Sequence, residues 1–254
     1  MIPWPQPQFG PAGAAVLGLL AVWFVVRIAR SPGTVARRRA EIESRPDGRV
    51  RFHRRYVLTW WLLALVALIP LLTDAALVPR DYGLVLPAPI WIAFSFGVFV
   101  LFVAIVWARD RFLRHRLAAV PPKVAFLLPR TAREQRWGVA TAFTAGICEE
   151  LVFRGALLAG AVGLLHLPII VAGILVSLFF GLGHLYQGAF GVIGTTLFGL
   201  CATALYVATG SLLLPVLIHA AVDLGPFALT RYREPAGEGD MSGAGAPRHI
   251  GLIA

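Results

Sequence analysis

Charged residues and cysteines are scarce in this chain of 254 residues. Charged side chains make up 14% of it, whereas a soluble globular domain carries about 25%. Cys148 and Cys201 are the only cysteines and both lie in apolar runs, so the sequence excludes a disulfide framework and a CxxC metal site. Apolar residues make up 58% of the chain. This balance excludes an ordinary soluble domain and favours a polytopic membrane protein.

The sequence predicts an all-α fold, a bundle of about seven transmembrane helices. A helix needs about 20 apolar residues to cross a bilayer. The first apolar run follows a segment without basic residues, unlike a secretory signal, so we expect it to be a retained helix. The seven predicted spans are residues 11–29, 56–79, 88–108, 137–163, 168–186, 189–209 and 212–230.

The basic residues indicate how these helices are oriented. Of the 23 Lys and Arg residues, ten lie between Arg27 and Arg55, eight between Arg109 and Arg136, and three in the tail after Thr230. Seven spans with the N-terminus outside place all three segments and the C-terminus on the cytoplasmic face, as the positive-inside rule requires. The net charge of +10 is then a topology signal that suits contact with membrane lipids of anionic headgroup. We expect no nucleic-acid partner.

The chain divides into three predicted parts. Residues 1–136 hold three spans with basic loops, 137–230 hold the last four spans, and 231–254 form a Gly-, Pro- and Ala-rich tail that we expect to be disordered. Residues 109–136 are basic and amphipathic, which predicts an interfacial helix and linker on the membrane surface. Lys123 is the single lysine. This preference for arginine is typical of prokaryotic sequences, so we expect a multi-pass protein of a bacterial cell membrane.

Ionisable side chains inside the apolar runs mark the candidate site. A charged group in hydrocarbon is costly and by default signals function. A single histidine, or a single Glu–Arg pair, is more often a structural partner between helices. Here such groups coincide on three separate runs, which favours a functional site. They are Glu149, Glu150, Arg154, His184, His219 and Asp223.

Helix geometry predicts how two of these residues pair. Glu150 and Arg154 are i and i+4, so they share a helix face and are expected to form an ion pair. Glu149 lies about 100° round the helix from Glu150. The sequence therefore predicts that Glu150 neutralises Arg154 and that Glu149 is available for chemistry.

The other ionisable residues are expected to complete the site. His219 and Asp223 are again i and i+4 and project from one face. His184 comes from another helix and could meet both. A carboxylate with two imidazoles and a second carboxylate suits either metal ligation or activation of water by a general base.

Three motifs resemble the CPBP family of intramembrane proteases, also called the ABI family, which includes CAAX prenyl endopeptidases and bacteriocin-processing enzymes. Glu149–Gly155 reads EELVFRG, similar to the EExxxR signature of that family. Phe180–His184 reads FGLGH and is similar to its FxxxH motif, and His219–Asp223 reads HAAVD, similar to HxxxN or HxxxD. The resemblance covers roughly residues 137–228, where the motifs stand in order and each in an apolar run.

The resemblance implies an intramembrane endopeptidase that hydrolyses a peptide bond of a membrane-associated peptide or protein. Glu149 would be the general base that activates water, assisted by His184. His219 and Asp223 would stabilise the oxyanion. In the alternative, these four residues would ligate a divalent metal such as zinc.

The same resemblance also gives expected roles to Glu150 and Arg154, and it bears again on Asp223. Glu150 and Arg154 would be structural or would orient the substrate. Asp223 stands where the CAAX branch of the family typically has Asn. Because an ionised Asp cannot donate a hydrogen bond to an oxyanion, Asp223 would be protonated, ligate a metal or orient His219, and it favours metal involvement.

Two other functions compete with the protease hypothesis. A non-proteolytic relative, a membrane scaffold or an immunity protein for a bacteriocin, would share the fold but need not keep every reactive side chain. An ion or proton transporter also uses buried Glu and His. A transporter built from repeats would show paired polar interruptions in both halves, whereas here the polar residues occupy one half.

Overall fold

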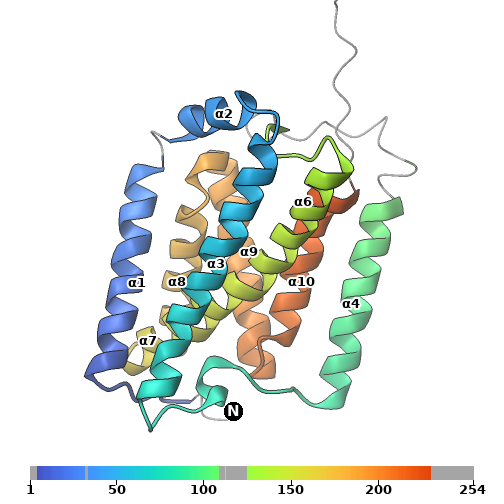
Figure 1. Ribbon diagram of the computed structural model, residues 1–254. Helices are drawn as coiled ribbons and strands as arrows, with labels where there is room; N and C mark the ends of the chain where they lie inside the picture. Colours follow the sequence, from blue (N-terminus) through green and yellow to red (C-terminus); the bar gives the residue numbers. More distant parts are fainter. Residues whose placement is uncertain (1–4, 32–33, 109–111, 113–124, 230–254) are drawn as a thin grey trace, which may run out of the picture.

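The structure is a computed structural model that describes residues 5–31, 34–108, 112 and 125–229. Every regular element in these residues is helical, and they contain no strand. The predicted all-α class is therefore confirmed. The long helices run side by side as a bundle, with α1 and α4 at opposite sides of it (Figure 1).

Three of the long helices, α1, α4 and α9, match the predicted spans 11–29, 88–108 and 189–209 within one residue at each end. Among the described residues, the helical elements up to Thr144 are α1 (Pro11–Arg30), α2 (Val35–Glu43), α3 (Gly48–Thr73), η1 (Pro79–Tyr82), α4 (Pro89–Ala108) and α6 (Ala132–Thr144). The next four are η3 (Ala145–Glu149), η4 (Leu151–Leu157), α7 (Leu158–Gly163) and α8 (Ile169–Leu182). The last four are η5 (Leu185–Gln187), α9 (Ala189–Thr209), α10 (Leu213–Leu224) and η6 (Gly225–Leu229).

Three helices of the described part are both long and apolar enough to cross a membrane, namely α1, α3 and α9. Shorter apolar helices cover Pro89–Ile105, Ile169–Leu182 and Leu213–Phe227. These findings support a protein with membrane-spanning helices. The number of seven spans and the placement of the termini stay predictions.

The second predicted span, 56–79, is displaced in the structure. Helix α3 begins at Gly48, inside the arginine-rich segment, because arginine is a good helix former and lets the helix continue beyond its apolar part. It ends at Thr73, and after a short connection Pro79 begins η1. Pro70 lies inside α3, as expected of a membrane helix that tolerates proline.

The helical segment that contains the fourth predicted span, 137–163, is longer than predicted and is not a regular α-helix throughout. It begins at Ala132, after a capping box in which the Thr131 side chain accepts a hydrogen bond from the backbone of Glu134. The wider π-helical turns η3 and η4 follow, on either side of Glu150. Such turns inside helices are frequent at functional sites.

An aromatic cluster joins the first helices to the later ones. The ring centroid of Phe24 in α1 lies 5.0 Å from that of Phe153 in η4 and 5.8 Å from that of Trp60 in α3. Phe153 in turn lies 5.1 Å from Phe180 of α8. The helices before and after residue 136 therefore share one core, although the predicted division at that residue stays a prediction.

One end of the bundle carries much of the positive charge. Helix α2, with Arg37, Arg38 and Arg39, lies across the end at which α3 and α6 begin (Figure 1). The interfacial helix predicted within 109–136 falls mostly outside the described residues. The tail predicted for 231–254 lies outside them entirely.

Candidate active site

Glu150 and Arg154 form the predicted ion pair. Arg154 Nη1 donates to Glu150 Oε1 at 3.0 Å, and both side chains have an exposed fraction of 0%. Arg154 Nη2 donates to the carbonyl oxygen of Gly199 in α9 at 3.1 Å. The guanidinium carbon also lies 4.5 Å from the ring centroid of Phe180, a cation–π contact. The pair thus joins η4 to α8 and α9.

Glu150 has a second partner that the sequence did not predict. The imidazole of His219 in α10 lies with Nδ1 2.7 Å from Glu150 Oε1. A carboxylate that is paired with arginine is ionised and can only accept, so Nδ1 carries the proton and donates it. This bond fixes the imidazole and directs Nε2 away from Glu150. Glu150 therefore serves the site as well as its own helix.

Glu149 makes no ion pair with Arg154, as its position on the helix predicted, but it shares His219 with Glu150. Its Oε2 lies 4.0 Å from His219 Nε2. Its Oε1 accepts a 2.5 Å hydrogen bond from the hydroxyl of Tyr56 in α3. Glu149 is buried. Among the described residues, the phenol of Tyr56 and the imidazole of His219 lie beside its carboxylate.

Tyr56 is the residue that the sequence reasoning missed. It stands in α3, outside all three motifs and far from Glu149 along the chain. A tyrosine at the end of an arginine-rich segment is an ordinary interfacial residue, and no local spacing links it to a helix two spans later. Only the packing of α3 against η3 and η4 brings the two side chains together.

His219 and Asp223 share a face, as predicted. Asp223 Oδ2 lies 3.9 Å from His219 Nε2. The exposed fraction of the side chain rises from 6% at His219 to 31% at Asp223. The buried acid–imidazole group is therefore most open at the Asp223 end of α10.

His184 lies near the other residues without bonding to them. It stands in the turn after α8, which ends at Leu182, and not within the predicted span helix. Its Nδ1 lies 3.0 Å from the carbonyl oxygen of Phe180, in the last turn of α8. The Phe180 ring packs against both imidazoles, with centroid distances of 4.9 Å to His184 and 5.9 Å to His219. In the described part of the chain, no hydrogen bond joins His184 to Glu149, His219 or Asp223.

The close approach of η3 and α10 depends on Gly146. A Cβ atom at this position would lie 2.8 Å from the backbone nitrogen of Ala220, nearer than any side chain permits. The glycine therefore allows contact between the two backbones. This contact is what brings Glu149 and Glu150 within reach of His219.

These donors do not fit a metal ion as they stand. Among the residues that the structure describes, no group of three or more His, Cys, Asp or Glu could hold one. Tetrahedral zinc with bonds of about 2.0–2.1 Å keeps its ligand atoms roughly 3.3 Å apart. His219 Nε2 is 4.0 Å from Glu149 Oε2 and 3.9 Å from Asp223 Oδ2, and Glu149 Oε1 is held by Tyr56. The predicted metal stays a prediction.

Comparison with known proteins agrees with the motifs. Residues 134–225 match the family described as type II CAAX prenyl endopeptidase Rce1-like. The matched segment contains Glu149, Glu150, Arg154, His184, His219 and Asp223. No curated protein and no solved structure matches the chain. The predicted resemblance to the CPBP proteases is confirmed over this segment.

Proposed function

Because residues 134–225 resemble a family of membrane-embedded proteases, we propose that the chain is an intramembrane endopeptidase in which Glu149 activates water. The substrate would be a membrane-associated peptide or protein. One observation carries the proposal. A buried carboxylate that makes no ion pair with Arg154 lies 4.0 Å from an imidazole whose other nitrogen is fixed by Glu150.

In the proposed reaction Glu149 takes a proton from water while the water oxygen attacks the carbonyl carbon of the scissile bond. The carbonyl oxygen then carries the negative charge of a tetrahedral intermediate. When the carbon–nitrogen bond breaks, Glu149 returns its proton to the leaving amine, which balances the hydrolysis. In water this charge would be solvated, whereas in a buried site it needs fixed donors.

His219 is the proposed donor to that oxyanion. Its Nδ1–H is committed to Glu150, so only Nε2 faces the space beside Glu149. When protonated, Nε2 can donate a hydrogen bond to developing negative charge. Asp223, 3.9 Å from the same nitrogen, would favour that protonated form. On this proposal Asp223 acts through His219, and His184 lines the approach to Glu149.

Tyr56 is the proposed positioning residue for Glu149. A hydroxyl that donates to one carboxylate oxygen restricts rotation of the side chain and leaves the second oxygen for water. The 2.5 Å bond to Oε1 and the position of Oε2 on the His219 side support this division of roles. The second predicted span would thereby contribute a side chain directly to the site.

We further propose seven spans with the N-terminus outside, in a bacterial cell membrane. The partial exposure of Asp223 supports an approach to the site from the side of the basic segments, which would be cytoplasmic on this topology. Reporter fusions in the 30–55 segment are expected to read cytoplasmic. A periplasmic signal there would overturn the topology.

The function is tested with full-length protein in detergent and a panel of quenched fluorescent peptides. We expect cleavage by the native chain and a loss of it in Glu149→Gln. Arg37→Gln serves as a matched control because Arg37 is exposed and outside the site. Retained cleavage in Glu149→Gln would overturn the assignment of the base. Cleavage that a chelator abolishes, and that added zinc restores, would show that a metal takes part.

A further inference from the structure

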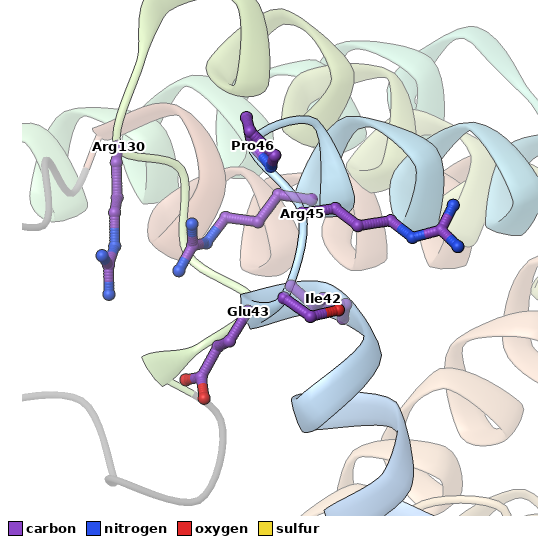
Figure 2. A pocket seen from close by; sticks show the side chains of 7 residues that line it. Ile42, Glu43, Arg45, Pro46 and Arg130 are labelled. Carbon is purple, nitrogen blue, oxygen red and sulfur yellow. The ribbon is translucent and has the colours of Figure 1, made fainter.

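A pocket of about 570 Å³ lies at the basic end of the bundle, where the turn between α2 and α3 comes close to Arg130 (Figure 2). Two charged side chains of its lining already have partners. Arg39 Nε donates to Glu43 Oε1 at 3.0 Å, and Arg49 Nε donates to the carbonyl oxygen of Phe126 at 3.0 Å. The group that extends the proposed function lies elsewhere, in the turn that follows α8.

Tyr186 stands beside the candidate active site, outside the residues that have a proposed role so far. It belongs to η5 (Leu185–Gln187), the short turn after α8, two positions beyond His184. Its ring centroid lies 5.8 Å from that of the His184 imidazole, and the two rings are tilted by 33°. The turn that carries His184 therefore also brings a phenol to the site.

The Tyr186 hydroxyl is bound as an acceptor only. Gln187 Nε2 donates to Tyr186 Oη at 3.0 Å. Gly191 of α9 makes room for Gln187, because a Cβ atom at this glycine would collide with the Gln187 side chain. A hydroxyl also has a proton to donate, and within the described ranges of the chain that proton has no acceptor. The hydroxyl oxygen is thus fixed from one side while its donor is unused.

Polar groups from three other elements lie close to the Tyr186 phenol. It interacts electrostatically with the carboxyl groups of Glu149 in η3 and Asp223 in α10. It also interacts with the hydroxyl of Tyr56 in α3, which itself donates to Glu149. Tyr186 is therefore part of the same polar cluster as the proposed base, and its proton is available to a substrate group that enters beside Glu149.

The proposed reaction can use a further donor. The former carbonyl oxygen of the tetrahedral intermediate carries a negative charge, which buried sites stabilise with preorganised donors, tyrosine hydroxyls among them. His219 offers only Nε2, because its Nδ1–H is bound to Glu150, and this nitrogen donates only while the imidazole is protonated. A phenol keeps its proton at neutral pH. Its donor is present whichever form His219 takes.

We propose that Tyr186 is a second hydrogen-bond donor to the oxyanion, a catalytic residue, and that Gln187 positions its hydroxyl. The proposal rests on the proposed peptidase function. Donation by the phenol moves no proton, since the O–H bond stays intact and the proton that Glu149 takes from water still goes to the leaving amine. Gln187 occupies one lone pair of Oη, which restricts the rotation of the O–H bond.

The test uses full-length protein in detergent, a peptide that the native chain cleaves, and the phosphinic analogue of that peptide. The analogue carries a tetrahedral, negatively charged group at the scissile position and so resembles the intermediate more than the substrate. The catalytic variant is Tyr186→Phe, which removes only the hydroxyl. Tyr82→Phe is the matched control, because it removes a buried phenol hydroxyl in η1, which contributes no residue to the candidate site.

We expect Tyr186→Phe to lower the single-turnover rate of cleavage by about 10²-fold, the loss that follows removal of one oxyanion donor. Affinity for the analogue should fall by about the same factor, whereas KM for the peptide and the unfolding temperature should stay at their native values. Tyr82→Phe should leave the rate unchanged. Equal weakening of peptide and analogue, or a lowered unfolding temperature, would make Tyr186 a packing residue and would overturn the proposal.

Gln187→Met tests the positioning role, because it keeps a side chain of similar length and removes the amide donor. We expect a smaller loss of rate, about tenfold, as for one net hydrogen bond. In the background of Tyr186→Phe the same change should cost nothing more, since the amide acts only through the hydroxyl. Additive losses in the double variant would overturn the role of Gln187.

The outcomes separate this inference from the function on which it rests. If Glu149→Gln loses cleavage while Tyr186→Phe cleaves at the native rate, the inference alone is overturned. If the native chain cleaves no peptide of the panel, the proposed function is overturned and the inference with it.

Discussion

Glu150–Arg154 and Arg39–Glu43 are ion pairs of the same local geometry in different surroundings. In both, the partners are i and i+4, and the nitrogen–oxygen distance is 3.0 Å. The exposed fractions of the side chains are 0% and 0% in the first pair, against 55% and 40% in the second. Spacing along the helix therefore does not predict how much an ion pair contributes to stability.

Burial decides the energetic consequence. An exposed pair is worth about 0–1 kcal/mol because water and salt screen it. Removal of one partner of a buried pair costs about 3–5 kcal/mol, because the other is left as an uncompensated charge. The Glu150 carboxylate also fixes His219. The buried pair thus supports the site, whereas the surface pair is one contact among many.

The largest effect on stability is expected from Glu150→Gln. This change leaves Arg154 inside the bundle without its counter-charge and weakens the bond to His219, so unfolding should become easier by about 3–5 kcal/mol. The measurement is thermal or denaturant unfolding of the protein in detergent. Glu150→Gln combined with Arg154→Gln should recover part of the loss, because no isolated charge remains. Additive losses in the double variant would show that the pair is not coupled.

A smaller effect, on turnover rather than stability, is expected from Tyr56→Phe. The phenyl ring keeps the packing of α3 but removes the hydroxyl that holds Glu149 Oε1. We expect kcat to fall about tenfold, which corresponds to one net hydrogen bond of about 1.4 kcal/mol, with little change in KM. Tyr56→Leu tests packing in addition. If Tyr56→Phe changed only the unfolding temperature and left kcat intact, Tyr56 would be a structural residue.

Local spacing predicted part of the candidate site correctly. The pairing of Glu150 with Arg154 and the shared face of His219 and Asp223 follow from i and i+4 positions within one helix. The absence of an ion pair between Glu149 and Arg154 follows from the rotation of about 100° between adjacent residues of a helix. These contacts could be inferred because both partners belong to a single helix, whose geometry is known in advance.

Contacts between helices could not be inferred in this way. The bonds from Tyr56 to Glu149 and from His219 to Glu150 depend on how closely helices pack. For His219, Gly146 permits this packing because it lets the backbones of η3 and α10 approach. The sequence allowed His184 to meet His219 and Asp223, and in the described residues its imidazole lies 3.0 Å from the Phe180 carbonyl oxygen and packs against the Phe180 ring. The π-helical turns beside Glu150 are likewise invisible in a pattern of apolar residues.

The smallest effect is expected at the surface pair of Asp47 and Arg51. The hydrogen bond from Arg51 lowers the pKa of the exposed Asp47 carboxyl below its ordinary value. A carboxyl whose pKa is lowered by folding adds stability above its unfolded pKa and loses it as the pH falls through the folded value. Asp47→Asn should therefore change the unfolding temperature slightly at pH 7 and low salt, and not at all at pH 2.5 or in 1 M salt. A large change at pH 7 would contradict the contrast with Glu150.

The division of roles between the two adjacent glutamates is tested most directly by the variant Glu149→Gln. Glutamine keeps the shape of the side chain and can still accept the hydrogen bond from Tyr56, but it cannot take a proton from water. The measurement is the single-turnover rate of peptide cleavage together with the unfolding temperature of the same preparation. We predict a rate lower by about 10²–10⁴-fold, as expected for loss of a general base, with an unfolding temperature at or above that of the native chain. Cleavage at the native rate, or a loss of stability as large as that of Glu150→Gln, would contradict the account.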